Sequence, residues 1–145
     1  MPNSVLRDAI TAEKLFPEKR KIIHFMQPHT PFIESEVDKS SNSIPEGVSE
    51  VDPENIATRE SKLNNEKLSE LDLAEEGRIS EELVIKHYRQ NLEILEKPLN
   101  ELGDSLEGKT VVTSDHGEVL NGNGLYGHWR GSKLSSLRKV PWDVL

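Results

Sequence analysis

One ten-residue stretch of this chain, from Lys109 to Glu118, constrains the fold more than any other, and its sequence is KTVVTSDHGE. Its first half is an apolar, β-branched run that ends abruptly in polar residues, which predicts a buried strand covered on both faces. Open α/β sheets bind their ligands at the carboxyl ends of their strands. We therefore expect this strand to deliver Asp115 and His116 into a crevice, with the small Gly117 where the chain must turn.

Asp115 and His116 together resemble half of a metal site, because a carboxylate oxygen and an imidazole nitrogen suit a divalent metal ion. A simpler interpretation uses the same residues. Ser114 and Asp115 would then cap a following helix, and His116 would lie in a surface turn. Spacing alone leaves both interpretations open.

The composition narrows the class of protein. The 145 residues are enough for one modest domain. The net charge of -8 and the pI of about 5.2 argue against an electrostatic binder of nucleic acid or of an anionic membrane. The absence of cysteine excludes disulfides, thiolate metal sites and a cysteine nucleophile. The sequence contains no signal peptide and no apolar run long enough to span a membrane, so we expect a cytoplasmic protein.

The N-terminal part predicts a helix over residues 4–16 and a strand over residues 21–27. Two prolines follow this strand in the motif PHTPF, residues 28–32, and they should hold the segment extended and outside any sheet ladder. His29 would then be presented on a stiff loop just past a strand end. His24 lies within the strand candidate, where we expect it to be buried or half-buried.

Residues 34–65 differ in composition from the rest of the chain. They are rich in Ser, Asn, Glu and Pro, and eight acidic residues stand against three basic ones. Such a segment cannot bury enough apolar surface to order itself well. We therefore predict a mobile acidic insertion within the domain, in preference to an active-site lid.

The second half of the chain predicts a short helix over residues 66–76 and a longer one over residues 80–102. Leucines and other apolar residues recur every three or four positions in the longer helix, and Pro98 should kink or break it. Residues 140–145 predict a final short strand.

A strand at 21–27, a long helical connection and a second strand at 109–114 form the pattern of a right-handed parallel crossover. The predicted fold class is therefore α/β, with a mainly parallel sheet and flanking helices.

Three loops carry the candidate chemistry, with His29, the Asp115–His116 pair and His128. If these side chains converged, they would suit Zn²⁺ or Mn²⁺, and the neighbouring Lys133 would add positive charge for an anionic group. Three unrelated surface histidines would produce the same spacing, so this alternative stays open.

Four motifs together resemble a known family. The chain resembles the C-terminal part of the catalytic domain in the sulfatase-like branch of the alkaline phosphatase superfamily, and especially the archaeal sulfatase-like hydrolases. The motifs, in chain order, are PHTPF at 28–32, TSDHGE at 113–118, YGH at 126–128 and RKVPW at 138–142. The resemblance covers residues 21–33 and 80–145. It implies a single partial sulfatase-like domain over residues 1–145, with helices on both sides of a mainly parallel sheet.

The resemblance also implies roles for individual residues. Asp115 and His116 would ligate the catalytic metal, with manganese or zinc favoured and calcium as the alternative, because calcium-binding sulfatases usually carry Asn at the position of His116. His29 and His128 would be catalytic and would contact the transferred anionic group of a sulfate or phosphate ester. Lys133 would be a further substrate contact.

One departure from the family concerns the nucleophile. Family members supply a Thr, Ser or formylglycine nucleophile and a further acidic ligand from a long N-terminal segment, which we do not find before residue 21. We therefore expect a truncated metal-dependent hydrolase that lacks its nucleophile and depends on a complementing N-terminal half or on a homo-oligomer. The alternatives are a non-catalytic remnant that binds a metal or a partner, and a chain too incomplete to fold stably.

Overall fold

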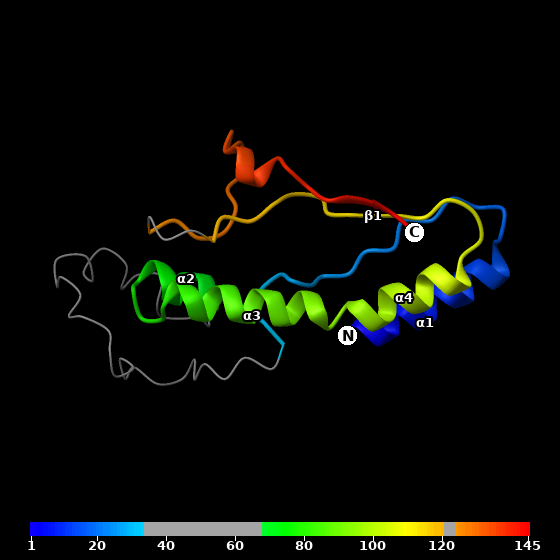
Figure 1. The fold of residues 1–145 in the computed structure, drawn as a ribbon, viewed down its shortest axis with the longest axis horizontal. Coiled ribbons are helices and arrows are strands. Elements are labelled where there is room, and N and C mark those ends of the chain that lie inside the picture. The colour runs from blue at the N-terminus through cyan, green and yellow to red at the C-terminus, as the bar shows by residue number, and fades with distance from the viewer. Residues whose placement is uncertain (34–67, 121–123) are drawn as a thin grey trace.

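The computed structural model describes residues 1–33, 68–120 and 124–145, and these residues form two layers (Figure 1). The helical layer contains four α-helices. The C-terminal layer, residues 109–120 and 124–145, contains a two-stranded sheet and one 3₁₀ helix. The acidic insertion expected at 34–65 lies outside the described residues. The elements are α1 (Pro2–Leu15), α2 (Glu70–Glu75), α3 (Glu81–Glu93), α4 (Glu96–Ser105), β1 (Val111–Thr113), η2 (Ser135–Leu137) and β2 (Trp142–Val144).

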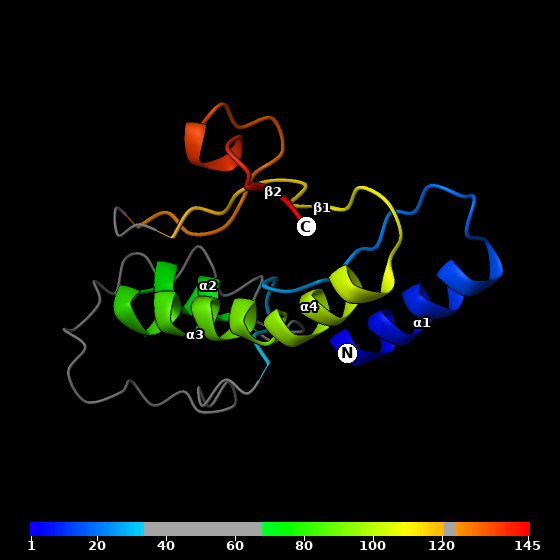
Figure 2. The same ribbon diagram turned by 45° about the vertical axis from the view of Figure 1, so that its right-hand side comes forward.

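Helix α1 confirms the predicted N-terminal helix. Its buried Leu6 and Ala9 pack with Leu102 of α4 in one small hydrophobic cluster, and Figure 2 shows α1 lying beside α4. An ion pair of 2.5 Å between Glu13 and Lys21 ties the end of α1 to the segment that follows it. No helix in the described ranges is long and apolar enough to cross a bilayer.

Local capping explains where α2 and α3 begin. The Ser69 hydroxyl accepts a hydrogen bond from the Asp72 amide, and the Asp72 carboxylate accepts one from the Ser69 amide, which completes a capping box. The Ser80 hydroxyl caps α3 by accepting from the Leu83 amide. A second hydrophobic cluster lies between α2 and α3, and its buried members are Phe32, Leu73, Ala74, Ile79, Val84 and Tyr126.

The single long helix predicted over residues 80–102 is interrupted earlier than expected. The chain breaks between α3 and α4 at Ile94 and Leu95, ahead of Pro98. Pro98 is the third residue of α4, in the first turn, where amide groups have no partner within the helix and a missing N–H costs nothing. The proline therefore starts a new helix instead of kinking one.

The predicted parallel sheet is wrong. Strand β1 pairs with β2, and the pair is antiparallel, with Val111 opposite Val144 and Thr113 opposite Trp142. Residues 21–27 form no strand; they run extended along the helices (Figure 1), and His24 is exposed.

The described residues therefore contain no parallel sheet, which contradicts the α/β sulfatase-like fold. A β-branched run predicts a strand without specifying its partner, and here the C-terminal residues take the place that residues 21–27 were expected to fill. Strand β1 is also only half-buried, because just one neighbouring strand and no second helical face cover it.

Candidate metal centre

A short antiparallel contact brings together two of the candidate side chains. Beyond β1, Val119 and Gly127 form an isolated bridge in which each amide donates to the other residue's carbonyl, at 3.1 and 2.9 Å. Residues next to an antiparallel bridge lie opposite one another. Glu118 therefore faces His128, and the His128 Nδ1 lies 3.0 and 3.2 Å from the two Glu118 carboxylate oxygens.

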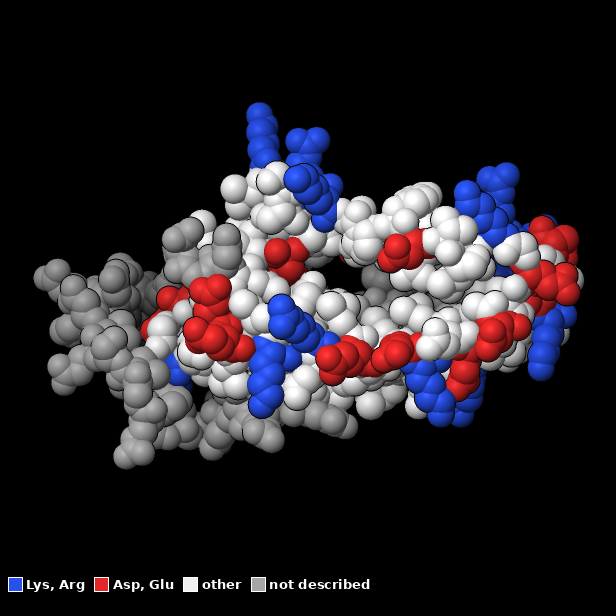
Figure 3. Space-filling view, in the orientation of Figure 1, with Lys and Arg blue, Asp and Glu red and all other residues white. Residues whose placement is uncertain are grey.

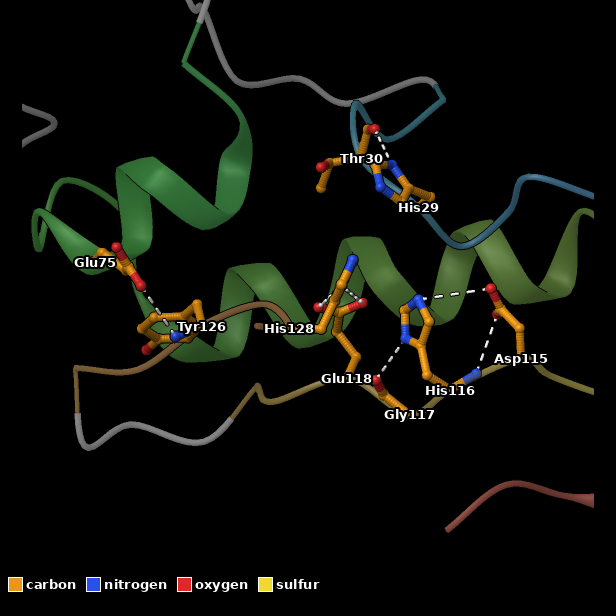
Figure 4. A network of polar contacts seen from close by, with 9 residues as sticks. All are labelled: His29, Thr30, Glu75, Asp115, His116, Gly117, Glu118, Tyr126 and His128. Atoms are coloured by element: carbon orange, nitrogen blue, oxygen red, sulfur yellow. Dashed lines mark hydrogen bonds and ion pairs between the residues drawn. The ribbon is translucent and has the colours of Figure 1, made fainter. Parts of the chain in front are cut away.

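His116 completes the group. Alternate residues of an extended chain project to the same side, so His116 and Glu118 point the same way (Figure 4). The His116 and His128 ring centroids lie 4.1 Å apart. His116, Glu118 and His128 each offer a ligand atom, and these three atoms all lie within 4.8 Å of one another. These three side chains are therefore the candidate ligands of a metal ion.

The hydrogen bonds at the imidazole rings set their tautomers. The His116 Nδ1 lies 2.9 Å from the Gly117 carbonyl, the His128 Nδ1 faces the Glu118 carboxylate, and the His29 Nδ1 contacts the Thr30 carbonyl. These oxygens only accept, so each neutral ring donates from Nδ1. Nε2 is then the nitrogen that each ring can offer to a metal ion, with Nδ1 held in the manner usual for metal-ligating histidines, and the His116 Nε2 lies 3.7 Å from an Asp115 carboxylate oxygen.

The sequence predicted a turn at Gly117, but the structure gives another reason why this position has no side chain. Its backbone is not in the left-handed region. Instead, the Ser136 carbonyl oxygen lies 1.9 Å from where a Cβ would stand, and the Gly117 amide donates to the Leu137 carbonyl at 3.2 Å. Any side chain here would collide with the backbone of η2. Gly117 therefore lets the two segments of the C-terminal layer meet beside the candidate ligands.

A cavity of about 250 Å³ lies beside these residues. His29, Glu118 and His128 line it, and Tyr88 does so from α3. Burial and the nearby Glu118 carboxylate raise the pKa of the Tyr88 phenol, so Tyr88 stays a neutral hydrogen-bond donor at physiological pH. Further acidic side chains contribute to the lining, while no Lys or Arg of the described residues does; these acidic residues are Asp72 and Glu75.

The position of His29 depends on a long-range anchor. The buried Asn91 of α3 accepts from the Ile33 amide at 2.8 Å and donates to the Ile33 carbonyl at 3.3 Å. The neighbouring Phe32 lies in the cluster between α2 and α3. These contacts hold residues 28–33 on the helical layer, and the His29 ring then lies 5.9 Å from that of His128.

The residues predicted from the sequence fall into two groups. Asp115, His116, His128 and His29 come together, although Asp115 is 68% exposed and its carboxylate lies 3.7 Å from the His116 Nε2. Lys133 is exposed and is not among the described residues that line the cavity. Their roles in metal binding, substrate binding and catalysis stay predictions.

Glu118 had no role in the sequence-based site, although its position two residues after His116 was a usable signal. Its carboxylate is the best shielded of the three candidate ligands, with a side chain 10% exposed.

Comparison with known proteins leaves the site to be interpreted from its own geometry. No protein-family model, no curated protein and no solved structure matches the chain. The likeness to sulfatase-like hydrolases therefore depends on the short motifs alone.

Proposed function

We propose that this chain binds a divalent transition-metal ion, Zn²⁺ or Mn²⁺, through His116, Glu118 and His128. The observation that carries the proposal is the approach of three donor atoms within 4.8 Å of one another. The hydrogen bonds that occupy Nδ1 of both histidines, and so make Nε2 the nitrogen available to a metal ion, also support it.

The donor set determines which ion fits. Two imidazoles and one carboxylate form the ligand set of several catalytic zinc sites, which leave a fourth position open. Manganese also accepts mixed nitrogen and oxygen ligands. Calcium prefers six to eight oxygen ligands, so two imidazoles disfavour it. Glu118 supports the ion in either of two ways, as a direct ligand or by holding His128 in the correct orientation.

Isothermal titration calorimetry of the full chain with Zn²⁺, Mn²⁺ and Ca²⁺ tests this proposal. We expect His116→Ala and His128→Ala each to weaken Zn²⁺ binding by about 100-fold or more, and Glu118→Gln by about 10–100-fold. His24→Ala is the matched control, because His24 is exposed and lies outside the site. Unchanged affinity in both His116→Ala and His128→Ala, or no binding of Zn²⁺ or Mn²⁺ by the unaltered chain, would contradict the proposal.

A second candidate function is the metal-dependent hydrolysis of sulfate or phosphate esters, and the cavity beside His29 and His128 favours it. A metal bound there would act as a Lewis acid and lower the pKa of a water molecule. His29, when protonated, would stabilise or protonate the leaving oxygen, while His128 would hold the metal and line the cavity. Because acidic residues line the cavity and no described Lys or Arg does, an anionic ester depends on the metal charge for its binding.

Assays with aryl sulfate and aryl phosphate esters in the presence of Zn²⁺, Mn²⁺ or Ca²⁺ test the second candidate. We expect slow turnover that is abolished by His116→Ala, reduced by Asp115→Ala, and lowered by about 10²–10⁴-fold in His29→Ala through loss of acid catalysis. His24→Ala should keep full activity. Tight metal binding without turnover of either ester would remove the hydrolase candidate and leave the metal site intact.

A further inference from the structure

Positive charge is concentrated in one part of an acidic chain. Residues 119–142 contain no acidic residue and four basic ones, Arg130, Lys133, Arg138 and Lys139, which we call the basic face. The whole chain carries a net charge of -8, so the residues outside 119–142 carry -12. The overall charge therefore conceals a local reversal of sign.

The four residues of the basic face are exposed and available. None of them forms an ion pair with an acidic side chain that the structure describes. Figure 3 shows Lys and Arg side chains projecting from the outer end of the C-terminal layer, around the position of η2, while Asp and Glu gather along the helical layer. The basic face thus lies at one end of the molecule, separated from most of the negative charge.

Exposed apolar side chains alternate with these charges along the same segment. Trp129 is 40% exposed, Leu134 44%, and Trp142 68%. Tryptophan is enriched where proteins meet the lipid headgroup region, because its ring is apolar and its N–H is polar. Lysine and arginine nearby attract anionic headgroups. Basic and apolar side chains together form the combination that binds the surface of a membrane without crossing it.

We propose that the basic face docks on an anionic lipid surface, with the exposed Trp142 entering the headgroup region. A flat bilayer that met the molecule at the basic face would lie on the side away from the helical layer, along which most Asp and Glu side chains gather (Figure 3). A nucleic acid fits less well, because an extended polyanion would also approach the acidic remainder of the chain.

The expected strength of membrane binding follows from the number of basic side chains in the basic face. Each Lys or Arg near an anionic leaflet contributes about fivefold to binding, so the basic face should raise partitioning several hundredfold over a neutral surface at low salt. This gain decreases as ionic strength rises, because salt screens exposed charges.

Co-sedimentation of the full chain with vesicles tests the proposal, with phosphatidylcholine alone compared with phosphatidylcholine containing phosphatidylserine. We expect binding to the mixed vesicles only, with an about 30-fold loss in the double variant Arg138→Gln/Lys139→Gln. The matched control is Lys86→Gln/Arg89→Gln, which removes the same charge from exposed positions of α3 and should bind as the unaltered chain does. Trp142→Ala should weaken binding and preserve the salt dependence.

Three outcomes would overturn the proposal. The first is no binding to phosphatidylserine vesicles at low salt. The second is an equal loss in both double variants, which would indicate a net-charge effect without a local surface. The third is binding of a single-stranded oligonucleotide through Arg138 and Lys139 without vesicle binding. Circular dichroism of each variant establishes that the helices are intact, since all the altered side chains are exposed.

Discussion

The two layers differ in how they are held together. The helical layer contains most of the buried apolar side chains, in one cluster between α1 and α4 and another between α2 and α3. The C-terminal layer buries three large hydrophobic residues, Val119, Tyr126 and Leu137, and Tyr126 packs in the cluster between α2 and α3. Yet it supplies all three candidate metal ligands and the basic face. The candidate metal ligands and the basic face therefore lie in the layer with the smaller hydrophobic core. This layer depends on a few specific backbone contacts.

The two layers can be observed separately. Both tryptophans of the chain, Trp129 and Trp142, lie in the C-terminal layer, whereas all four α-helices of the described residues lie in the other. Tryptophan fluorescence therefore reports on one layer and far-ultraviolet circular dichroism on the other. Coincident unfolding curves would show that the two layers unfold as a single cooperative unit.

The largest effect is expected from Leu73→Ala, which tests the core of the helical layer. Leu73 is 3% exposed and belongs to the cluster between α2 and α3. Removing its buried methyl groups should lower the free energy of unfolding by about 2–5 kcal/mol, measured by urea denaturation. Leu134→Ala, at a position 44% exposed in the C-terminal layer, is the control and should change it by less than about 1 kcal/mol. Equal losses of unfolding free energy in Leu73→Ala and Leu134→Ala would contradict the difference in core size between the two layers.

A smaller loss is expected when the link between α3 and residues 28–33 is cut. Asn91→Ala leaves the amide and carbonyl of Ile33 without their partner. Partly buried groups that lose their hydrogen bonds cost about 1–3 kcal/mol, which should appear in circular dichroism and fluorescence alike if Asn91 holds His29 near His128. Gln90→Ala, at an exposed position of the same helix, should be close to neutral. A stable Asn91→Ala variant would show that this anchor is dispensable.

Gly117→Ala is the substitution that we expect to destabilise one layer and to leave the other almost unchanged. The new Cβ would meet the Ser136 carbonyl, so β1 and η2 must move apart, at a cost of about 1–3 kcal/mol confined to the C-terminal layer. We expect a lower midpoint by fluorescence, weaker Zn²⁺ binding and an almost unchanged circular-dichroism midpoint. Gly103→Ala is the control, because its Cβ would meet only the flexible Leu145 side chain, at 3.4 Å. A Gly117→Ala variant with unaltered metal affinity would contradict the proposed role of this contact.

The smallest effect concerns the ion pair at the end of α1. A hydrogen bond from Lys21, with its charge, lowers the pKa of the Glu13 carboxyl in the folded chain. The stabilisation is therefore present above the unfolded-state pKa and is lost as the pH falls through the lower folded-state pKa. Between neutral and acidic pH the unaltered chain should lose slightly more thermal stability than Glu13→Gln. Glu18→Gln, at an exposed position, should behave as the unaltered chain does. Identical pH profiles for the unaltered chain and Glu13→Gln would exclude a contribution from the pair.

Local sequence signals predicted helices over much of residues 4–16, 66–76 and 80–102, but not the break at Ile94 and Leu95. Ser69 and Ser80 cap α2 and α3 through bonds that span three residues, and the N-terminal helix forms where its apolar pattern predicted. The sequence also singled out Asp115, His116, His128 and His29 as candidates, because imidazoles at the ends of apolar segments are visible without a fold, but it left open whether they would converge.

Only the tertiary structure decided how the strand at Lys109–Glu118 is paired and what completes its site. Strand pairing joins residues far apart in the sequence, so the β-branched run could not indicate whether β1 would meet residues 21–27 or the C-terminal strand β2. The role of Glu118 depends in the same way on the bridge between Val119 and Gly127, which sets it opposite His128. Residue types and local caps are properties of short segments, whereas strand partners and converging ligands depend on contacts that form when distant segments pack together.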